Sequence, residues 1–204
     1  MRKKIIITGG LGYIGTELCK LYSGVSWNNE IIVIDNRFVS ERVNQVRNWN
    51  MEFVHGDILD KDLINKYCKN ADVIHHLAGI TEVPRTKSEA NEVQDNKIKI
   101  VAEEGTQNIL DAISDKCKII FPSTHVVYEG MEKIQNEILE NEEVKPILSY
   151  SRSKALNEKQ LKQSGKNYII LRLGSVYGYS SDTARIDIMP NLFSKIASQD
   201  GTIK

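Results

Sequence analysis

Tyr150 and Lys154 are the residues whose types and spacing best suit acid–base chemistry in this sequence. They lie four apart in a stretch that predicts a helix over residues 150–163, so their side chains share one helix face. A phenol with a pKa of about 10 is a poor base at neutral pH, and a neighbouring ammonium group lowers that pKa. The pair therefore predicts a proton-transfer site, although an ordinary surface pair of this spacing also arises by chance.

Thr124 follows a predicted strand and adds a hydroxyl that could hold a substrate alcohol against Tyr150. The surrounding sequence lacks the Gly-x-Ser-x-Gly turn of a Ser-His-Asp hydrolase. His125 lies beside Thr124, and we interpret it as a strand-end histidine bonded to backbone. His75 and His76 are neighbours in a predicted strand and should point to opposite faces, so we expect no metal site there.

A glycine-rich loop, TGGLGYIG at residues 8–15, lies between a β-branched run at residues 4–8 and a helical pattern that starts near Ile14. Glycines allow a tight turn and let the backbone approach a pyrophosphate closely. The start of the following helix supplies unpaired N–H groups and a positive dipole. The loop therefore predicts a dinucleotide site, and the alternative is an ordinary glycine-rich turn.

Asp35 ends the second predicted strand, where a carboxylate can accept hydrogen bonds from both hydroxyls of an adenosine ribose. A carboxylate there would repel a 2′-phosphate, which favours NAD over NADP. Arg37 is a possible partner for such a phosphate. The alternative for Asp35 is a simple loop or cap residue.

Predicted strands alternate with predicted helices along the chain. We predict strands at residues 4–8, 30–34, 51–55, 71–76, 118–121 and 168–173, and helices at 14–22, 59–69, 97–114 and 150–163. Such alternation predicts an α/β fold, a doubly wound parallel sheet of Rossmann type that binds ligands at the carboxyl ends of its strands. Residues 133–145 are polar and acidic and predict a loop.

The overall composition is that of a packed globular protein of 204 residues, with 41% hydrophobic and 26% charged residues. Lys plus Arg equals Asp plus Glu at 27 each, which argues against nucleic acid as a partner. No window predicts a signal peptide or a membrane span. The three cysteines are widely spaced and fit neither a disulfide framework nor a zinc site, so we expect a reducing cytoplasm.

In order along the chain, TGGLGYIG, VIDN, HGDI, HHLAG, FPSTHVVYEG, YSRSK and LRLGSVYG resemble the extended short-chain dehydrogenase/reductase family. The resemblance is to its NAD-dependent nucleotide-sugar epimerases and dehydratases in particular. It implies a cofactor site and a catalytic triad. The cofactor residues would be Gly9, Gly12, Tyr13, Ile14 and Gly15 at the pyrophosphate, Asp35 and Asn36 at the ribose, Asp57 and Ile58 at the adenine, and Leu77, Ala78 and Gly79 along the groove. The triad would be Thr124, Tyr150 and Lys154, of which Tyr150 and Lys154 would also contact the cofactor.

Three positions depart from the pattern of the family. Ala102 and Ser175 stand where many relatives have asparagine, and Glu129 replaces the glycine that follows a Val-Tyr pair. His125 stands where sugar-nucleotide dehydratases carry the first residue of an Asp-Glu pair, which favours epimerisation over dehydration.

The resemblance also implies a domain division and an assembly. Residues 1–174 would form the NAD-binding domain, and residues 175–204 would begin a substrate-binding domain that is cut short at what should be a strand. A homodimer would form through helices at residues 97–114 and 150–163, where Val101, Ile109 and Ile113 supply apolar surface or serve the core instead.

The leading functional hypothesis is a nucleotide-sugar epimerase that forms a transient keto-sugar by hydride transfer to and from NAD. A dehydratase, or a net NAD-dependent dehydrogenase or reductase, is the enzymatic alternative. A protein that binds the cofactor without catalysis is the third.

Overall fold

The computed structural model describes residues 2–81, 91–133, 136–181, 185–186 and 188–202. In these residues one sheet of six parallel strands has the order β3-β2-β1-β4-β5-β6. The strands are β1 (Lys4–Thr8), β2 (Glu30–Asp35), β3 (Glu52–His55), β4 (Val73–His76), β5 (Lys118–Thr124) and β6 (Asn167–Leu173). The predicted doubly wound parallel sheet is confirmed.

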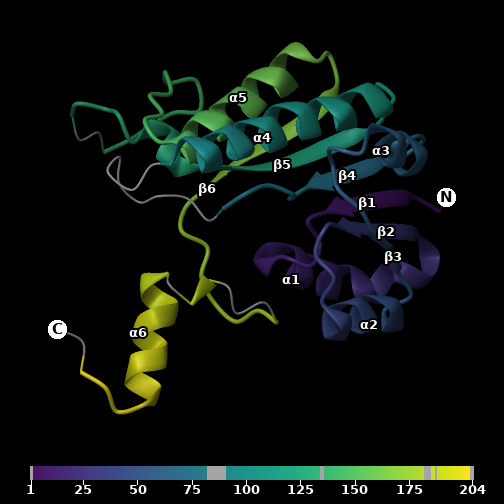
Figure 1. Ribbon diagram of the computed structural model, residues 1–204, viewed down its shortest axis with the longest axis horizontal. Coiled ribbons are helices and arrows are strands. Elements are labelled where there is room, and N and C mark those ends of the chain that lie inside the picture. Colours follow the sequence, from purple (N-terminus) through teal and green to yellow (C-terminus); the bar gives the residue numbers. More distant parts are fainter. Residues whose placement is uncertain (1, 82–90, 134–135, 182–184, 187, 203–204) are drawn as a thin grey trace.

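Helices cover both faces of the sheet. They are α1 (Tyr13–Tyr22), α2 (Ser40–Asn48), α3 (Lys61–Cys68), α4 (Glu92–Ala112), α5 (Ser149–Gln163) and α6 (Met189–Ser198), with short 3-10 helices η1 (Ser23–Asn28) and η3 (His125–Tyr128). Figure 1 shows α1 and α2 on one face and α3, α4 and α5 on the other. Because the strand order reverses between β1 and β4, a crevice is expected there at the carboxyl ends of the strands.

Strand β1 shows why the sheet must be buried on both faces. Ile5, Ile6 and Ile7 are each at most 4% exposed. Successive strand residues point to opposite faces, so Ile6 packs in the core cluster under α3 and α4, while Ile5 and Ile7 pack with residues of α1 and α2. Each such side chain contributes about 1.5–3 kcal/mol to folding by leaving water.

Two helices were not predicted from the sequence. Helix α2 is mainly polar, and only Val43 and Val46 are buried, so its apolar stripe is too short to stand out. Helix α6 lies in a part of the chain for which no element was predicted, and the strand expected where the sequence stops remains a prediction, because residues 203–204 lie outside the described residues. The spacing of Met189, Leu192 and Phe193 is helical, and a proline in the first turn suits a helix start.

The environment of α6 differs from that of the other helices. No residue of α6 is buried, and Figure 1 shows it standing apart from the sheet. At the β6 edge of the sheet, Ile169 and Leu171 are about two-fifths exposed. Among the described residues, no helix is long and apolar enough to cross a membrane.

The predicted acidic loop at residues 133–145 contains no helix or strand where the structure describes it, and residues 134–135 lie outside that description. Ile109 and Ile113 are buried in the core, and Val101 packs against it. The sequence left open whether these three side chains form a dimer surface or belong to the core, and the structure places them in the core.

Candidate active site

The glycine-rich loop forms a cradle of bare backbone between β1 and α1. Gly9 has a positive φ of 69°, and a Cβ there would lie 2.7 Å from the backbone nitrogen of Ala78. A Cβ on Gly10 would lie 2.3 Å from a methyl group of Val33, and one on Gly15 would lie 2.4 Å from the Gly9 carbonyl oxygen. These positions admit no side chain, which explains why the loop is built of glycine.

Helix α1 begins directly behind this loop, and its amino end faces the same space. Gly12 is its N-cap residue and provides no side-chain cap, so the first N–H groups of α1 stay available to an acceptor. An anion is the acceptor that a helix amino terminus favours. Loop and helix together fit the pyrophosphate of a dinucleotide.

Asp35 lies at the carboxyl end of β2, with its side chain 5% exposed. Its Oδ2 accepts a hydrogen bond of 2.9 Å from the Leu11 backbone, and its Oδ1 accepts one of 2.9 Å from the Arg37 backbone. The Arg37 guanidinium lies 3.7 Å from Oδ1. Asp35 therefore also fixes the glycine loop to β2, a role that the sequence analysis missed.

The other residues assigned to the adenosine lie at the neighbouring strand ends. Asn36 donates from Nδ2 to Asp57 Oδ2 over 2.9 Å, which joins the ends of β2 and β3. The side chain of Ile58 is buried in the core against Gly105, which leaves only its backbone for a contact with a ligand, and its carbonyl oxygen accepts a hydrogen bond of 3.0 Å from Asn108.

The segment after β4 lies against the glycine loop. Ala78 donates its backbone N–H to Thr8 Oγ1 over 3.3 Å, and the backbone of Leu77 and Ala78 lies within 3 Å of the Cβ position of Gly9. Gly79 follows directly after them, and nothing lies within 4 Å of its Cβ position. These three residues therefore form a wall next to the glycine cradle.

Tyr150 lies in the first turn of α5, and its phenol forms a hydrogen bond with the Thr124 side chain at the end of β5. Burial raises the pKa of Tyr150 above its ordinary value, while Arg185 and the Thr124 hydrogen bond act to lower it. Arg185 comes from the segment after β6, and no local sequence signal pointed to it.

Lys154 lies one turn further along α5. Its Nζ donates to the Pro122 carbonyl over 2.9 Å and lies 4.5 Å from the centroid of the Phe121 ring and 5.9 Å from that of the Tyr150 ring. Burial lowers the pKa of Lys154 to about 8. The predicted set of Thr124, Tyr150 and Lys154 is thus brought together at the carboxyl end of β5.

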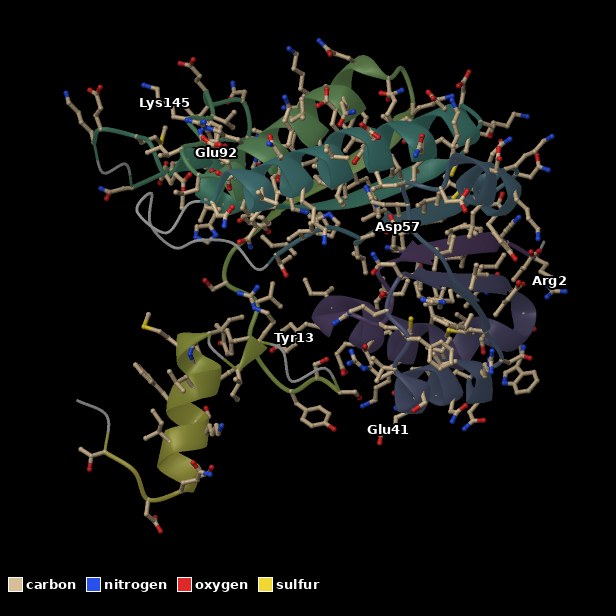
Figure 2. The ribbon with its side chains drawn as sticks, in the orientation of Figure 1. Arg2, Tyr13, Glu41, Asp57, Glu92 and Lys145 are labelled. Carbon is tan, nitrogen blue, oxygen red and sulfur yellow. The ribbon has the colours of Figure 1, made fainter. Side chains whose placement is uncertain are left out.

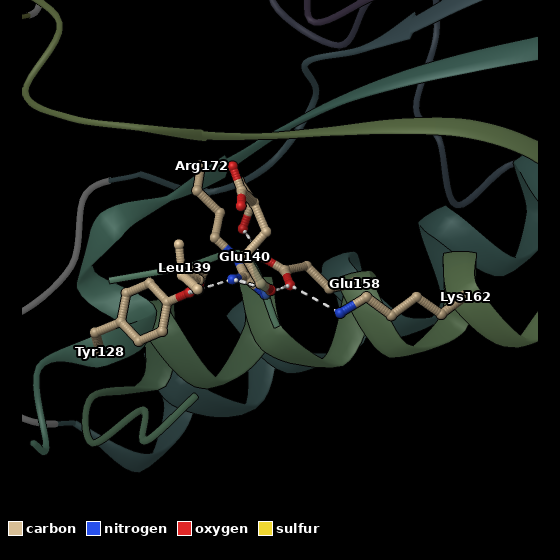
Figure 3. Close-up of polar contacts among 7 residues, drawn as sticks. Tyr128, Leu139, Glu140, Glu158, Lys162 and Arg172 are labelled. Atoms are coloured by element: carbon tan, nitrogen blue, oxygen red, sulfur yellow. Dashed lines mark hydrogen bonds and ion pairs between the residues drawn. The ribbon is translucent and has the colours of Figure 1, made fainter. Parts of the chain in front are cut away.

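Ser123 precedes Thr124, but its hydroxyl is used elsewhere. It donates to Glu158 Oε1 over 2.6 Å, and Glu158 Oε2 is paired with Arg172 Nη2 at 2.6 Å. Figure 3 shows the part of this network around Glu158 and Arg172, in which Arg172 also reaches Tyr128. The network ties α5 to β5 and β6 and leaves Thr124 as the hydroxyl on the site side.

A second polar network lies under the site, inside the core. His76 Nδ1 lies 2.9 Å from Thr8 Oγ1, and His76 Nε2 lies 3.0 Å from Thr106 Oγ1 on α4. Asn157 of α5 donates to the same Thr106 hydroxyl over 2.9 Å. His75 points the other way and contacts Tyr22 of α1 at 2.7 Å, so the predicted opposite orientation of the two histidines is confirmed.

Two further predictions concern single side chains at the site. His125 is exposed, and its Nδ1 lies 3.1 Å from the Leu173 carbonyl oxygen, which confirms a strand-end histidine bonded to backbone. Tyr13 donates its hydroxyl to the Gly178 carbonyl over 2.5 Å and accepts from Asn191 over 3.0 Å. Figure 2 shows Tyr13 at this junction, where its side chain joins α1 to the segment after β6.

The geometry of the site agrees with comparisons to known proteins. Residues 5–203 match the model of the NAD dependent epimerase/dehydratase family. The chain belongs to this family. The match covers both the glycine cradle and the Tyr150–Lys154 helix, so the two parts of the site belong to one known type of enzyme domain.

Three relatives show the range of this family. The chain is 34% identical over 186 residues to a putative UDP-glucose 4-epimerase of Methanocaldococcus jannaschii, covering 87% of this chain and 57% of the relative. It is 29% identical to a dTDP-D-glucose 4,6-dehydratase of Dictyostelium discoideum, covering 86% of this chain and 44% of the relative. A solved UDP-glucuronic acid 4-epimerase of Bacillus cereus, in complex with UDP-glucuronic acid and NAD, has a TM-score of 0.77 at 26% identity, covering 97% of this chain and 64% of that one.

The chain therefore spans about half the length of the curated family members that it matches.

Two of the residues that depart from the family pattern have environments that the structure describes. Ala102 accepts a hydrogen bond of 2.7 Å from Asn157 through its carbonyl oxygen, and Ser175 is exposed.

Proposed function

We propose that this protein is an NAD-dependent nucleotide-sugar epimerase that acts through a transient keto-sugar. The observation that supports this most directly is the hydrogen-bonded pair of Tyr150 and Thr124 beside Lys154, next to a glycine cradle that fits a dinucleotide. In this proposal residues 1–174 bind NAD and residues 175–204 belong to the substrate-binding part.

The cofactor residues in this proposal are those named from the sequence. Gly9, Gly12, Tyr13, Ile14 and Gly15 lie at the pyrophosphate, with Asp35 and Asn36 at the ribose, Asp57 and the Ile58 backbone at the adenine, and Leu77, Ala78 and Gly79 along the groove. The exclusion of side chains at Gly9 and Gly15 supports the first part of this assignment, and the burial of Asp35 beside the loop supports the second.

The chain's own residues supply the acid–base steps. Tyr150 takes the proton of a sugar hydroxyl and, after the keto-sugar has presented its other face to the cofactor, returns a proton to the same oxygen, while Thr124 holds that hydroxyl in line. Lys154 and Arg185 place positive charge near the phenol and favour its ionised form. NAD, when bound, accepts the hydride and gives it back, so the cycle consumes no oxidant.

The alternative functions differ from an epimerase in the products that they release. A dehydratase is favoured by the Dictyostelium relative, and His125 in place of an acidic residue argues against it. A net dehydrogenase or reductase would use the same three side chains but change the redox state of the cofactor. A non-catalytic protein would keep the cradle without turnover.

We also propose a cytoplasmic homodimer. The three cysteines are free and buried, and burial raises the pKa of Cys19 and Cys68 to about 12, which fits a reducing compartment. For the dimer, Ile100 on α4 is 45% exposed, and a hollow of about 610 Å³ runs along α5 beside Ala155 and Leu156.

The test is incubation of the chain with NAD and, in separate reactions, UDP-glucose, UDP-N-acetylglucosamine and UDP-glucuronic acid, with products identified by NMR. We expect conversion of one substrate to its epimer without accumulation of reduced nicotinamide. Tyr150→Phe should abolish it, since no phenol remains to exchange the proton. A product lacking water identifies a dehydratase, and stoichiometric reduced nicotinamide identifies a dehydrogenase. Tight NAD binding with no turnover of any nucleotide-sugar would contradict catalysis.

A further inference from the structure

Glu129 places a carboxylate at the amino end of α5, the helix that carries Tyr150 and Lys154. Its Oε1 accepts hydrogen bonds from the backbone N–H groups of Ile147 at 2.7 Å and Leu148 at 2.6 Å. The Ser151 hydroxyl donates to the same oxygen. One side chain thus receives three hydrogen bonds from residues on both sides of the helix start.

The carboxylate of Glu129 lies at a helix start that has no side-chain cap of its own. Leu148 is the N-cap residue of α5, and it makes no side-chain cap. N–H groups at a helix start need an acceptor, and an anion is favoured there by the helix dipole. From outside the helix, Glu129 supplies an anionic acceptor to the N–H group of the N-cap residue Leu148 and to that of Ile147 before it.

The same residue belongs to the element that follows Thr124. Helix η3 begins directly after Thr124, and Glu129 is its C-cap residue. Two backbone bonds hold the neighbouring segments together, from Lys145 N to the Val127 carbonyl at 2.8 Å and from Gly130 N to the Lys145 carbonyl at 2.9 Å. Glu129 therefore connects the end of β5 with the first turn of α5.

We propose that Glu129 is a positioning residue that fixes the first turn of α5 and so holds the Tyr150 phenol against Thr124. The inference rests on the proposed function only in that Tyr150 is the base of that reaction. It gives a use to a glutamate that stands where the resemblance implies glycine.

The charge of Glu129 decides in which direction its replacement should change the pKa of Tyr150. Partial burial acts to raise the pKa of Glu129, but the hydrogen bonds from Ser151, Leu148 and Ile147, together with the charge of Arg152, hold it below its usual value. The side chain is therefore an anion at neutral pH.

Loss of Glu129 has two opposite effects on Tyr150. Removing a negative charge lowers the pKa of the phenol, while loosening the Thr124 hydrogen bond raises it, because that bond favours the phenolate. Arg185 and Lys154, which also face Tyr150, are unchanged. Charge and anchoring can therefore be separated by two substitutions.

The experiment compares Glu129→Ala with Glu129→Gln in the full chain. Tyrosine ring-carbon NMR over a pH titration, with Tyr150→Phe to assign the signal, reports the Tyr150 pKa. Amide exchange at Arg152, whose N–H donates to Leu148, reports the first turn of α5. Glu132→Ala is the matched control, since the structure describes no side-chain hydrogen bond for this exposed residue three positions away.

For Glu129→Ala we expect a raised Tyr150 pKa and roughly fivefold faster exchange at Arg152, the size of a lost cap. Glu129→Gln keeps an acceptor oxygen, so it should restore most of the protection without raising the pKa. If both variants lower the Tyr150 pKa equally, Glu129 acts by charge and the proposal is wrong. If neither changes pKa or exchange relative to Glu132→Ala, it is wrong as well. Both readouts are independent of turnover, so inactivity toward nucleotide-sugars would leave this test intact.

Discussion

At the scale of single residues, Asp35 has a structural role and a proposed role in cofactor recognition. Its carboxylate holds the Leu11 and Arg37 backbone N–H groups while lying at the end of β2, where the ribose of a dinucleotide is proposed to bind. A 2′-phosphate beside this buried carboxylate would set two anions against each other. In a partly dehydrated groove that costs more than about 1.4 kcal/mol, or at least about tenfold in affinity.

We therefore predict that the chain binds NAD at least about tenfold more tightly than NADP in calorimetric titrations. Asp35→Asn should narrow this difference because it removes the charge and keeps most of the shape. Asp62→Asn, an exposed carboxylate on α3, is the matched control and should change nothing. Equal or tighter binding of NADP by the unmodified chain would mean that Arg37 captures the phosphate and that Asp35 does not select the cofactor.

At the scale of elements, His76 joins strand and helix inside the core. It connects Thr8 of β1 with Thr106 of α4, and Asn157 of α5 completes the chain of hydrogen bonds. Burial, and next the charge of Lys154, lower the pKa of His76 to about 3. The imidazole is thus neutral in the folded protein over a pH range in which an unfolded histidine takes up a proton.

The free energy of unfolding should therefore fall as the pH drops from about 6.5 toward about 3. In this window the unfolded chain binds one more proton at His76 than the folded chain, which costs about 1.4 kcal/mol per pH unit. His75, whose pKa burial also lowers, adds to the same trend. Urea unfolding at a series of pH values measures the slope.

In His76→Gln we expect lower stability at neutral pH and a shallower slope than in the unmodified chain. His55→Gln removes an exposed histidine and serves as the control. An unchanged slope in His76→Gln would show that His76 takes up its proton without unfolding.

At the scale of the whole molecule, apolar surface is unevenly distributed. Ile100 of α4, the helix that packs against α5, is 45% exposed, and the hollow along α5 is lined by Val144, Pro146 and Leu156. Leu21 of α1 is 79% exposed. The proposed dimer would cover Ile100 and the hollow along α5 and would leave Leu21 in solvent.

We predict that sedimentation finds a dimer for the unmodified chain and a shift toward monomer for Ile100→Glu, because a charge buried in an apolar interface is costly. Leu21→Glu should keep the dimer. A monomer at all concentrations for the unmodified chain, or a dimer unaffected by Ile100→Glu, would rule out this interface.

Much of the architecture followed from local pattern. Strand β1 is buried on both faces, so its β-branched residues do not alternate with polar ones, and this pattern predicts a central strand of a parallel sheet. The glycine loop was recognisable because no other residue fits its turn, and Tyr150 and Lys154 because four residues make one helix turn. These features depend on neighbours in sequence, and the sequence by itself determined them.

The tertiary structure decided which side chains contact the residues of the site. Arg185 beside Tyr150, Glu129 at the start of α5 and the anchoring of the glycine loop by Asp35 join segments far apart in the chain. Helix α6 was not predicted although its apolar spacing is helical. The pKa values of Lys154 and His76 depend on burial, which no local pattern states. Contacts and desolvation arise only once the sheet and its two layers of helices have packed, and for that physical reason they could not be read from the sequence.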